Sequence, residues 1–275
     1  MPEYLALEED QTTGARLKRY FRAADVEYWT ELWQRSPNTS YERELRGHLP
    51  HQLRSTFSRW VARGAKTLEA GCGLGHFTVA ASALGYRAEG LDWSAATIER
   101  LRRQFDWIPW HAGDVRSLPF PADSFDAIYS PGVCEHFVEG PIRVLEETRR
   151  VLRRGGFAIV STPCFNEWLQ RRASRLTRLS LLLDRTGAAC PERSRAPDES
   201  AFHEYLFTPD GMATLLGRLG FDVVQIRPFA TLDTLVRFGG WRVPGSLEYP
   251  LAFSMDYLPI VRRWGSTCIW VARKR

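Results

Sequence analysis

From Lys66 to Ser161, in the middle of the chain, segments with two different spacings of apolar residues alternate. Short continuous apolar runs are typical of buried strands, whereas apolar residues that recur every three or four positions are typical of amphipathic helices. Strands that alternate with helices favour an α/β fold with a parallel sheet. The pattern predicts strands at residues 66–70, 87–92, 108–112, 125–130 and 156–161, and helices at residues 75–84, 94–105 and 140–153.

Three segments lie outside this alternation. Residues 1–60 are rich in aromatic side chains and predict a helical cap, residues 163–204 predict a lid insertion, and residues 229–264 predict a second cap. Within 163–204, leucines and arginines over 168–183 predict one amphipathic helix. We therefore expect a single domain over 1–275, with its core in 61–162 and 205–275.

The second part of the core begins with a helix signal. Thr208 suits the N-cap position and Pro209 the first helical position, where a missing N–H costs nothing. Further strands are expected from Phe221 to Ile226 and from Ser266 to Ala272.

The first predicted strand ends in a glycine-rich turn. A carboxylate, Glu69, precedes three alternating glycines, Gly71, Gly73 and Gly75. Glycine is needed where the backbone turns tightly or where a ligand approaches too closely for a Cβ atom. A dinucleotide site would place its third glycine where this chain has His76, which disfavours a nicotinamide oxidoreductase. Glu69 would repel a pyrophosphate but suits a ligand with a cationic amino acid end.

Acidic residues follow at the ends of the next strands. Asp92 ends the second predicted strand, where this architecture binds ribose hydroxyls. Asp114 comes after the third, ahead of an apolar stretch over 118–130. In order and spacing, the glycine turn and these segments resemble the class I S-adenosylmethionine (SAM) dependent methyltransferases. The segments 133–137 and 203–209 resemble the type 11 group related to quinone biosynthesis.

This resemblance implies a fold and a cofactor. The fold is a doubly wound, seven-stranded, mostly parallel Rossmann-like sheet with helical and aromatic cap insertions. The cofactor is SAM, and the product is S-adenosylhomocysteine. Glu69 and the backbone of Gly71, Gly73 and Gly75 would hold the methionine end of SAM. The remaining contacts would be Asp92 to the ribose, Trp93 and Asp114 to the adenine, Val115 through its backbone N–H, and Ser130 and Pro131 near the sulfonium.

Two histidines are candidates for acceptor activation. A hydroxyl or amine acceptor must lose a proton at or near methyl transfer, and histidine suits that role at neutral pH. His136 and His203 are expected near the carboxyl edge of the sheet, although a histidine there can equally hold a backbone carbonyl. No clustered carboxylates after the fifth strand indicate a metal site, so we expect a metal-independent reaction.

The resulting hypothesis is a methyltransferase that modifies an O, N or C nucleophile of a small or lipid-like metabolite. One alternative is the methylation of a sugar or polyketide in a secondary pathway. Another is a SAM-fold protein that binds or regulates without turnover.

Charge and cysteine content restrict which binding partners and which cellular compartment we expect. The net charge of +5 is modest and spread along the chain, so we expect no nucleic-acid partner. Five scattered cysteines and an acidic N-terminus without an apolar segment predict a cytoplasmic protein. The arginines over 168–183 could contact a membrane surface or an anionic acceptor, or they could form a solvated helix face.

Overall fold

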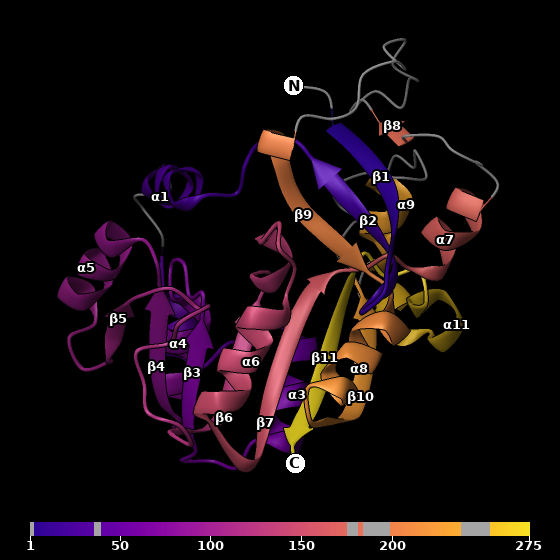
Figure 1. The fold of residues 1–275 in the computed structure, drawn as a ribbon. Helices are drawn as coiled ribbons and strands as arrows, with labels where there is room; N and C mark the ends of the chain where they lie inside the picture. Colours follow the sequence, from indigo (N-terminus) through magenta and orange to yellow (C-terminus); the bar gives the residue numbers. More distant parts are fainter. Residues whose placement is uncertain (1–2, 36–39, 175–180, 184–198, 238–253) are drawn as a thin grey trace.

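The computed structural model describes residues 3–35, 40–174, 181–183, 199–237 and 254–275. A central sheet of seven strands organises the chain, in the order β10-β11-β7-β6-β3-β4-β5 (Figure 1). β11 runs antiparallel to β10 and β7 on either side of it. The other pairings described in this sheet are parallel, so the expected doubly wound, mostly parallel fold is confirmed. The strands are β3 (Lys66–Ala70), β4 (Arg87–Asp92), β5 (Trp110–Ala112), β6 (Phe125–Pro131), β7 (Leu152–Pro163), β10 (Phe221–Phe229) and β11 (Thr267–Lys274).

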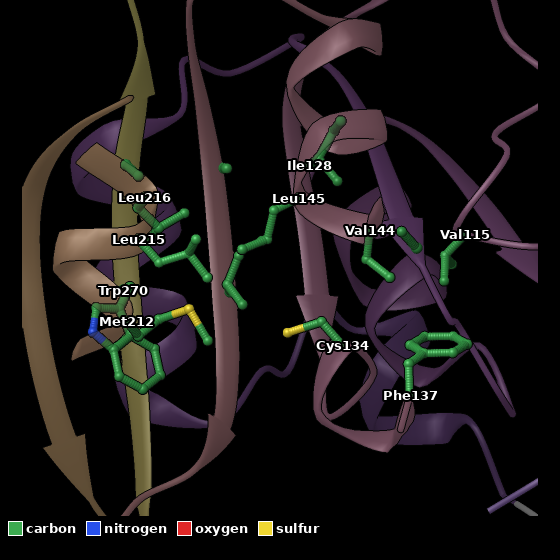
Figure 2. Packing of buried hydrophobic residues seen from close by; sticks show 14 of the residues in the cluster. Val115, Ile128, Cys134, Phe137, Val144, Leu145, Met212, Leu215, Leu216 and Trp270 are labelled. Atoms are coloured by element: carbon green, nitrogen blue, oxygen red, sulfur yellow. The ribbon is translucent and has the colours of Figure 1, made fainter. Parts of the chain in front are cut away.

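Helices cover both faces of this sheet because its strands are apolar on both sides. Ile128 of β6 belongs to one buried cluster, with Leu145 and Leu215 from the helices on that side (Figure 2). Its neighbours Ala127 and Tyr129 belong to a second cluster on the opposite face. Successive side chains of a strand point to opposite faces, so β6 contributes to both cores. The first face carries α6 (Ile142–Val151) and α8 (Pro209–Arg218), and the second carries α3 (His51–Trp60), α4 (His76–Ala83) and α5 (Ala95–Gln104).

A second sheet of four strands, in the order β8-β1-β2-β9, lies beyond the carboxyl ends of the parallel strands (Figure 1). It joins the start of the chain, β1 (Glu3–Asp10) and β2 (Gly14–Tyr20), to β8 (Leu181–Leu183) and β9 (Phe202–Phe207). Its pairings are antiparallel. The expectation that 1–60 is helical is therefore wrong for its first third, which forms β1 and β2.

The hairpin between β1 and β2 has a local cause. The Asp10 carboxylate oxygen Oδ1 accepts hydrogen bonds from the backbone N–H groups of Thr12 and Thr13, at 2.9 and 2.7 Å. Gly14 then has φ +69°, a left-handed conformation that glycine adopts without strain. An Asx-type turn closed by glycine is a hairpin signal. The prediction of a helical cap for 1–60 rested on the aromatic content of the segment and did not take this signal into account.

The predicted helix over 168–183 is only half correct. The structure has α7 at Glu167–Ser174, places 175–180 outside the described residues, and pairs β8 with β1. The membrane contact predicted for this segment stays a prediction. Within the part of the chain that the structure describes, no helix has both the length and the apolarity needed to cross a bilayer.

The remaining elements are short. Thr208 caps α8 as expected, with its side chain accepting from the Gly211 N–H. Among the described residues, further elements are α1 (Val26–Gln34), α2 (Glu42–Leu45), η1 (Cys134–His136), η2 (Glu199–Ala201), α9 (Thr231–Arg237) and α11 (Pro259–Arg262).

Two glycines of α8 allow a test of how the second sheet is seated. A Cβ atom on Gly211 would lie 1.9 Å from the carbonyl oxygen of Thr13 in the hairpin turn, whereas a Cβ on Gly217 would meet nothing within 4 Å. Gly211→Ala should therefore force the hairpin away from α8 and lower the free energy of unfolding by about 1–3 kcal/mol. Gly217→Ala should raise it by up to about 1 kcal/mol. Chemical denaturation of both variants measures the difference, and equal stabilities would contradict this packing.

Candidate cofactor and acceptor site

The turn after β3 is anchored to the end of β4. The N–H groups of Gly71 and Cys72 both donate to the Leu91 carbonyl at 2.8 Å. Gly71 has φ +85°, and a Cβ there would lie 2.4 Å from Val133 Cγ2. A side chain at this position would be both strained and blocked, which explains the first glycine of the motif.

Asp92 takes part in the same anchor. One carboxylate oxygen, Oδ2, accepts from the Gly73 N–H at 2.9 Å, and the other accepts from the Ser94 N–H at 3.0 Å. The side chain is buried, and burial raises its pKa above the ordinary value. Asp92 therefore shapes the turn and the start of α5, and it also lines the cavity described below.

Glu69 is a second buried acid at this end of the sheet. Its Oε2 accepts from the backbone N–H of Thr78 at 3.0 Å and from the Thr78 hydroxyl at 2.5 Å. Burial, with a smaller contribution from Asp92, raises the pKa of Glu69 to about 8. Two acids that are costly to ionise, side by side in a cavity, favour a cationic ligand.

A cavity of about 350 Å³ opens over these acids. Its floor is the glycine turn with Glu69 and Asp92, and its wall includes Trp29 and Trp33 of α1. The two indoles stack with their ring centres 5.4 Å apart. The cavity thus combines an acidic end with an aromatic wall.

Most predicted cofactor residues line this cavity, but three do not. Trp93, Val115 and Pro131 line it together with Glu69, Gly71, Gly73 and Asp92. Asp114 is absent from the lining, and its carboxylate accepts a hydrogen bond from Arg116 through Oδ2 at 2.7 Å. Ser130 is absent as well; its hydroxyl is buried without a hydrogen-bond partner among the described residues. Gly75 instead starts α4 as its N-cap residue.

The two predicted catalytic histidines lie next to each other. Their ring centres are 5.3 Å apart, and the ring of His136 also packs edge-on against Trp29 at 4.9 Å. His136 lines the cavity, whereas His203 lies behind it on β9. Burial lowers the pKa of His136 to about 3, so its imidazole is neutral at physiological pH.

Sequence reasoning assigned no site role to Trp29, Trp33, Val133 or Phe137, which all line the cavity. The tryptophans were visible only as part of an aromatic-rich segment. Their spacing of four residues, which places both on one helix face, was the available signal.

Comparison with known proteins identifies this arrangement. Residues 68–160 match the methyltransferase domain family of type 11. A protein of Mycolicibacterium smegmatis, named probable S-adenosylmethionine-dependent methyltransferase, is 35% identical over 100 residues, which cover 36% of this chain and 38% of that protein. An S-adenosylmethionine dependent methyltransferase from Mesorhizobium loti superposes with a TM-score of 0.52 at 21% identity, over 86% of this chain and 99% of that one. Residues 68–160 form a class I methyltransferase domain.

A malonyl-[acyl-carrier protein] O-methyltransferase of Pectobacterium atrosepticum is similar over a longer stretch. It is 28% identical over 212 residues, which cover 72% of this chain and 82% of that protein. The match to the M. smegmatis protein, in contrast, spans well under half of that protein's length.

SAM is the cofactor of this methyltransferase domain, and the cavity residues suit it. Its ammonium and sulfonium groups are cationic, which fits the two buried acids Glu69 and Asp92.

The raised pKa of Glu69 makes the methyltransferase domain less stable at alkaline pH. Between about pH 4.5 and pH 8 the folded state holds a proton that the unfolded chain has released, so the free energy of unfolding falls as pH rises. Glu69→Gln removes this loss. The melting temperature of the ligand-free variant should match that of the wild type near pH 5 and exceed it by a few degrees near pH 8.5.

Glu89→Gln on the neighbouring strand is the matched control. Glu89 binds Lys66 and His111 at 2.9 Å, and its pKa is lowered by these hydrogen bonds against the opposing effect of burial. Its removal should lower the melting temperature instead. A Glu69→Gln variant less stable than the wild type at pH 8.5 would refute the account of Glu69.

Proposed function

We propose that this chain is a SAM-dependent methyltransferase that methylates an O, N or C nucleophile of a small or lipid-like metabolite. The observation that carries the proposal is the single cavity that joins two buried acids, suited to the cofactor, to an aromatic wall and a neutral imidazole. SAM, when bound, supplies an activated methyl group for in-line displacement. The protein then contributes mainly position and electrostatics.

Each end of the cavity has its own task in this proposal. The ammonium group of SAM would stabilise the ionised form of Glu69. Asp92 would accept hydrogen bonds from the ribose hydroxyls while it still accepts one from the Gly73 N–H. The apolar wall of Trp29, Trp33 and Phe137 would exclude water and receive the apolar body of the acceptor.

His136 would accept the proton of a hydroxyl or amine acceptor. Its Nδ1 lies 2.7 Å from the His203 carbonyl oxygen, which can only accept a hydrogen bond. A hydrogen on Nδ1 would satisfy this carbonyl and would place the lone pair of the neutral ring at Nε2. His203 would act as a positioning residue, through its backbone carbonyl and its ring contact with His136.

The match to the Pectobacterium protein supports a second acceptor class. The name of that protein implies methylation of a carboxylate carried by an acyl-carrier protein, and its similarity covers most of both chains. A carboxylate is already ionised at neutral pH and needs no base, so the two classes differ in their dependence on His136.

Two variants test the proposal, with S-adenosylhomocysteine production as the activity readout. Asp92→Asn should weaken SAM binding by about 2–3 kcal/mol, because charge-assisted hydrogen bonds are lost. The control Asp126→Asn alters an aspartate that also accepts a backbone N–H, from Lys66 at 2.8 Å, but outside the cavity. It should leave SAM affinity unchanged.

His136→Gln should lower turnover of a hydroxyl or amine acceptor by about 100-fold or more and leave SAM affinity intact. Acceptors to compare are polar and lipid-like metabolite pools and malonyl-acyl-carrier protein. Turnover only with malonyl-acyl-carrier protein, undiminished in His136→Gln, would favour the carboxylate class. SAM binding without turnover of any pool would indicate a binding or regulatory protein instead.

A further inference from the structure

A buried cluster of metal-binding side chains lies at the junction of the two sheets. His136 belongs to η1, and His203 and Glu204 belong to β9 of the second sheet. One ring nitrogen of each histidine and one carboxylate oxygen of Glu204 all lie within 4.8 Å of one another. Two imidazoles and a carboxylate form a ligand set that suits Zn²⁺ and related divalent ions.

Both imidazoles are oriented as metal ligands usually are. His136 Nδ1 lies 2.7 Å from the His203 carbonyl oxygen, and His203 Nδ1 lies 2.9 Å from the Arg22 carbonyl oxygen. With the hydrogen of each ring on Nδ1, toward its carbonyl, Nε2 would be the nitrogen that binds a cation. Backbone carbonyls on the second ring nitrogen are a common support of metal-bound histidines.

A fourth residue independently points to a missing cation. Glu135 is 1% exposed, and its Oε2 has no hydrogen-bond partner among the described residues. Its Oε1 lies 3.9 Å from His136 Nε2, on the side of the ring that faces away from the His203 carbonyl. A buried carboxylate oxygen without a partner is costly, and a cation next to His136 Nε2 would provide one.

Arg19 supplies part of the required positive charge. Its guanidinium binds Glu204 Oε1 at 3.0 Å. A carboxylate can bind a guanidinium through one oxygen and a metal through the other, so Arg19 and a cation are compatible.

We propose that His136, His203 and Glu204 form a binding site for a divalent transition-metal ion of the Zn²⁺ type, with Glu135 beside it. Small movements of the side chains would bring the ligand atoms to bonding distance. This differs from the metal-independent reaction expected from the sequence. No spacing along the chain reveals the site, because its parts are 67 residues apart and meet only in the folded protein.

The site would also affect the acceptor, a role that rests on the proposed function. With the ion bound at Nε2, His136 would be a ligand and no longer the base. Because His136 lines the cofactor cavity, an open coordination position on the ion could bind an acceptor oxygen there. The ion would lower the pKa of a bound hydroxyl. Metal binding itself, in contrast, does not depend on methyl transfer.

The test uses the full-length protein after treatment with a chelator. We expect calorimetry with Zn²⁺ to show one tight site at pH 7.5, and Co²⁺ at the same site to show the visible bands of a nitrogen- and oxygen-ligated ion. His203→Gln should weaken Zn²⁺ binding by about 100-fold. The control His111→Gln alters a histidine that also contacts a glutamate, Glu89, at 2.9 Å, but lies outside the cluster. It should bind Zn²⁺ like the wild type.

A rise in melting temperature with S-adenosylhomocysteine verifies that each variant is folded. It also separates the two proposals, because SAM binding can persist when metal binding fails. The metal site is overturned if the chelated wild type binds no stoichiometric Zn²⁺. It is equally overturned if a folded His203→Gln variant binds Zn²⁺ as tightly as the His111→Gln control.

Discussion

The hydrogen bonds that tie the glycine turn to the end of β4 are the constraint on which the site depends. Gly71 and Cys72 donate to the Leu91 carbonyl, and Gly73 donates to Asp92. These bonds hold the turn after β3 against the neighbouring parallel strand and aim the start of α4 at the cavity. The tight contact between Gly71 and Val133 extends the same constraint to the loop after β6. Side chains from three strand ends therefore meet in one place.

This arrangement has an energetic cost that a ligand can offset. Glu69 and Asp92 are buried near each other, and their raised pKa values show that ionisation is unfavourable in the free protein. A cationic cofactor would relieve that cost on binding, which links affinity to the same groups that weaken the ligand-free fold. Stability and function thus oppose each other at Glu69, as is common at binding sites.

The central sheet could be predicted from the sequence because its signals are local. Strand and helix spacing, the glycine turn and the Thr208 cap each depend on a few adjacent residues, and all were confirmed. The second sheet could not be predicted, because β2 and β9 pair residues that are far apart in the sequence, such as Arg16 and Phe207, which are 191 positions apart. The same pairing brings His203 to His136. Asp114 shows a second reason why part of the site could not be predicted. The acid is at the expected position, but its carboxylate is bound by Arg116, two residues later in the chain.

The cofactor-binding role of this turn can be measured directly by calorimetric titration of the full-length protein with S-adenosylhomocysteine and, separately, with NAD. The account predicts that S-adenosylhomocysteine binds to one site per chain and that NAD produces no binding heat. Binding of NAD at that site, or no binding of S-adenosylhomocysteine, would contradict it.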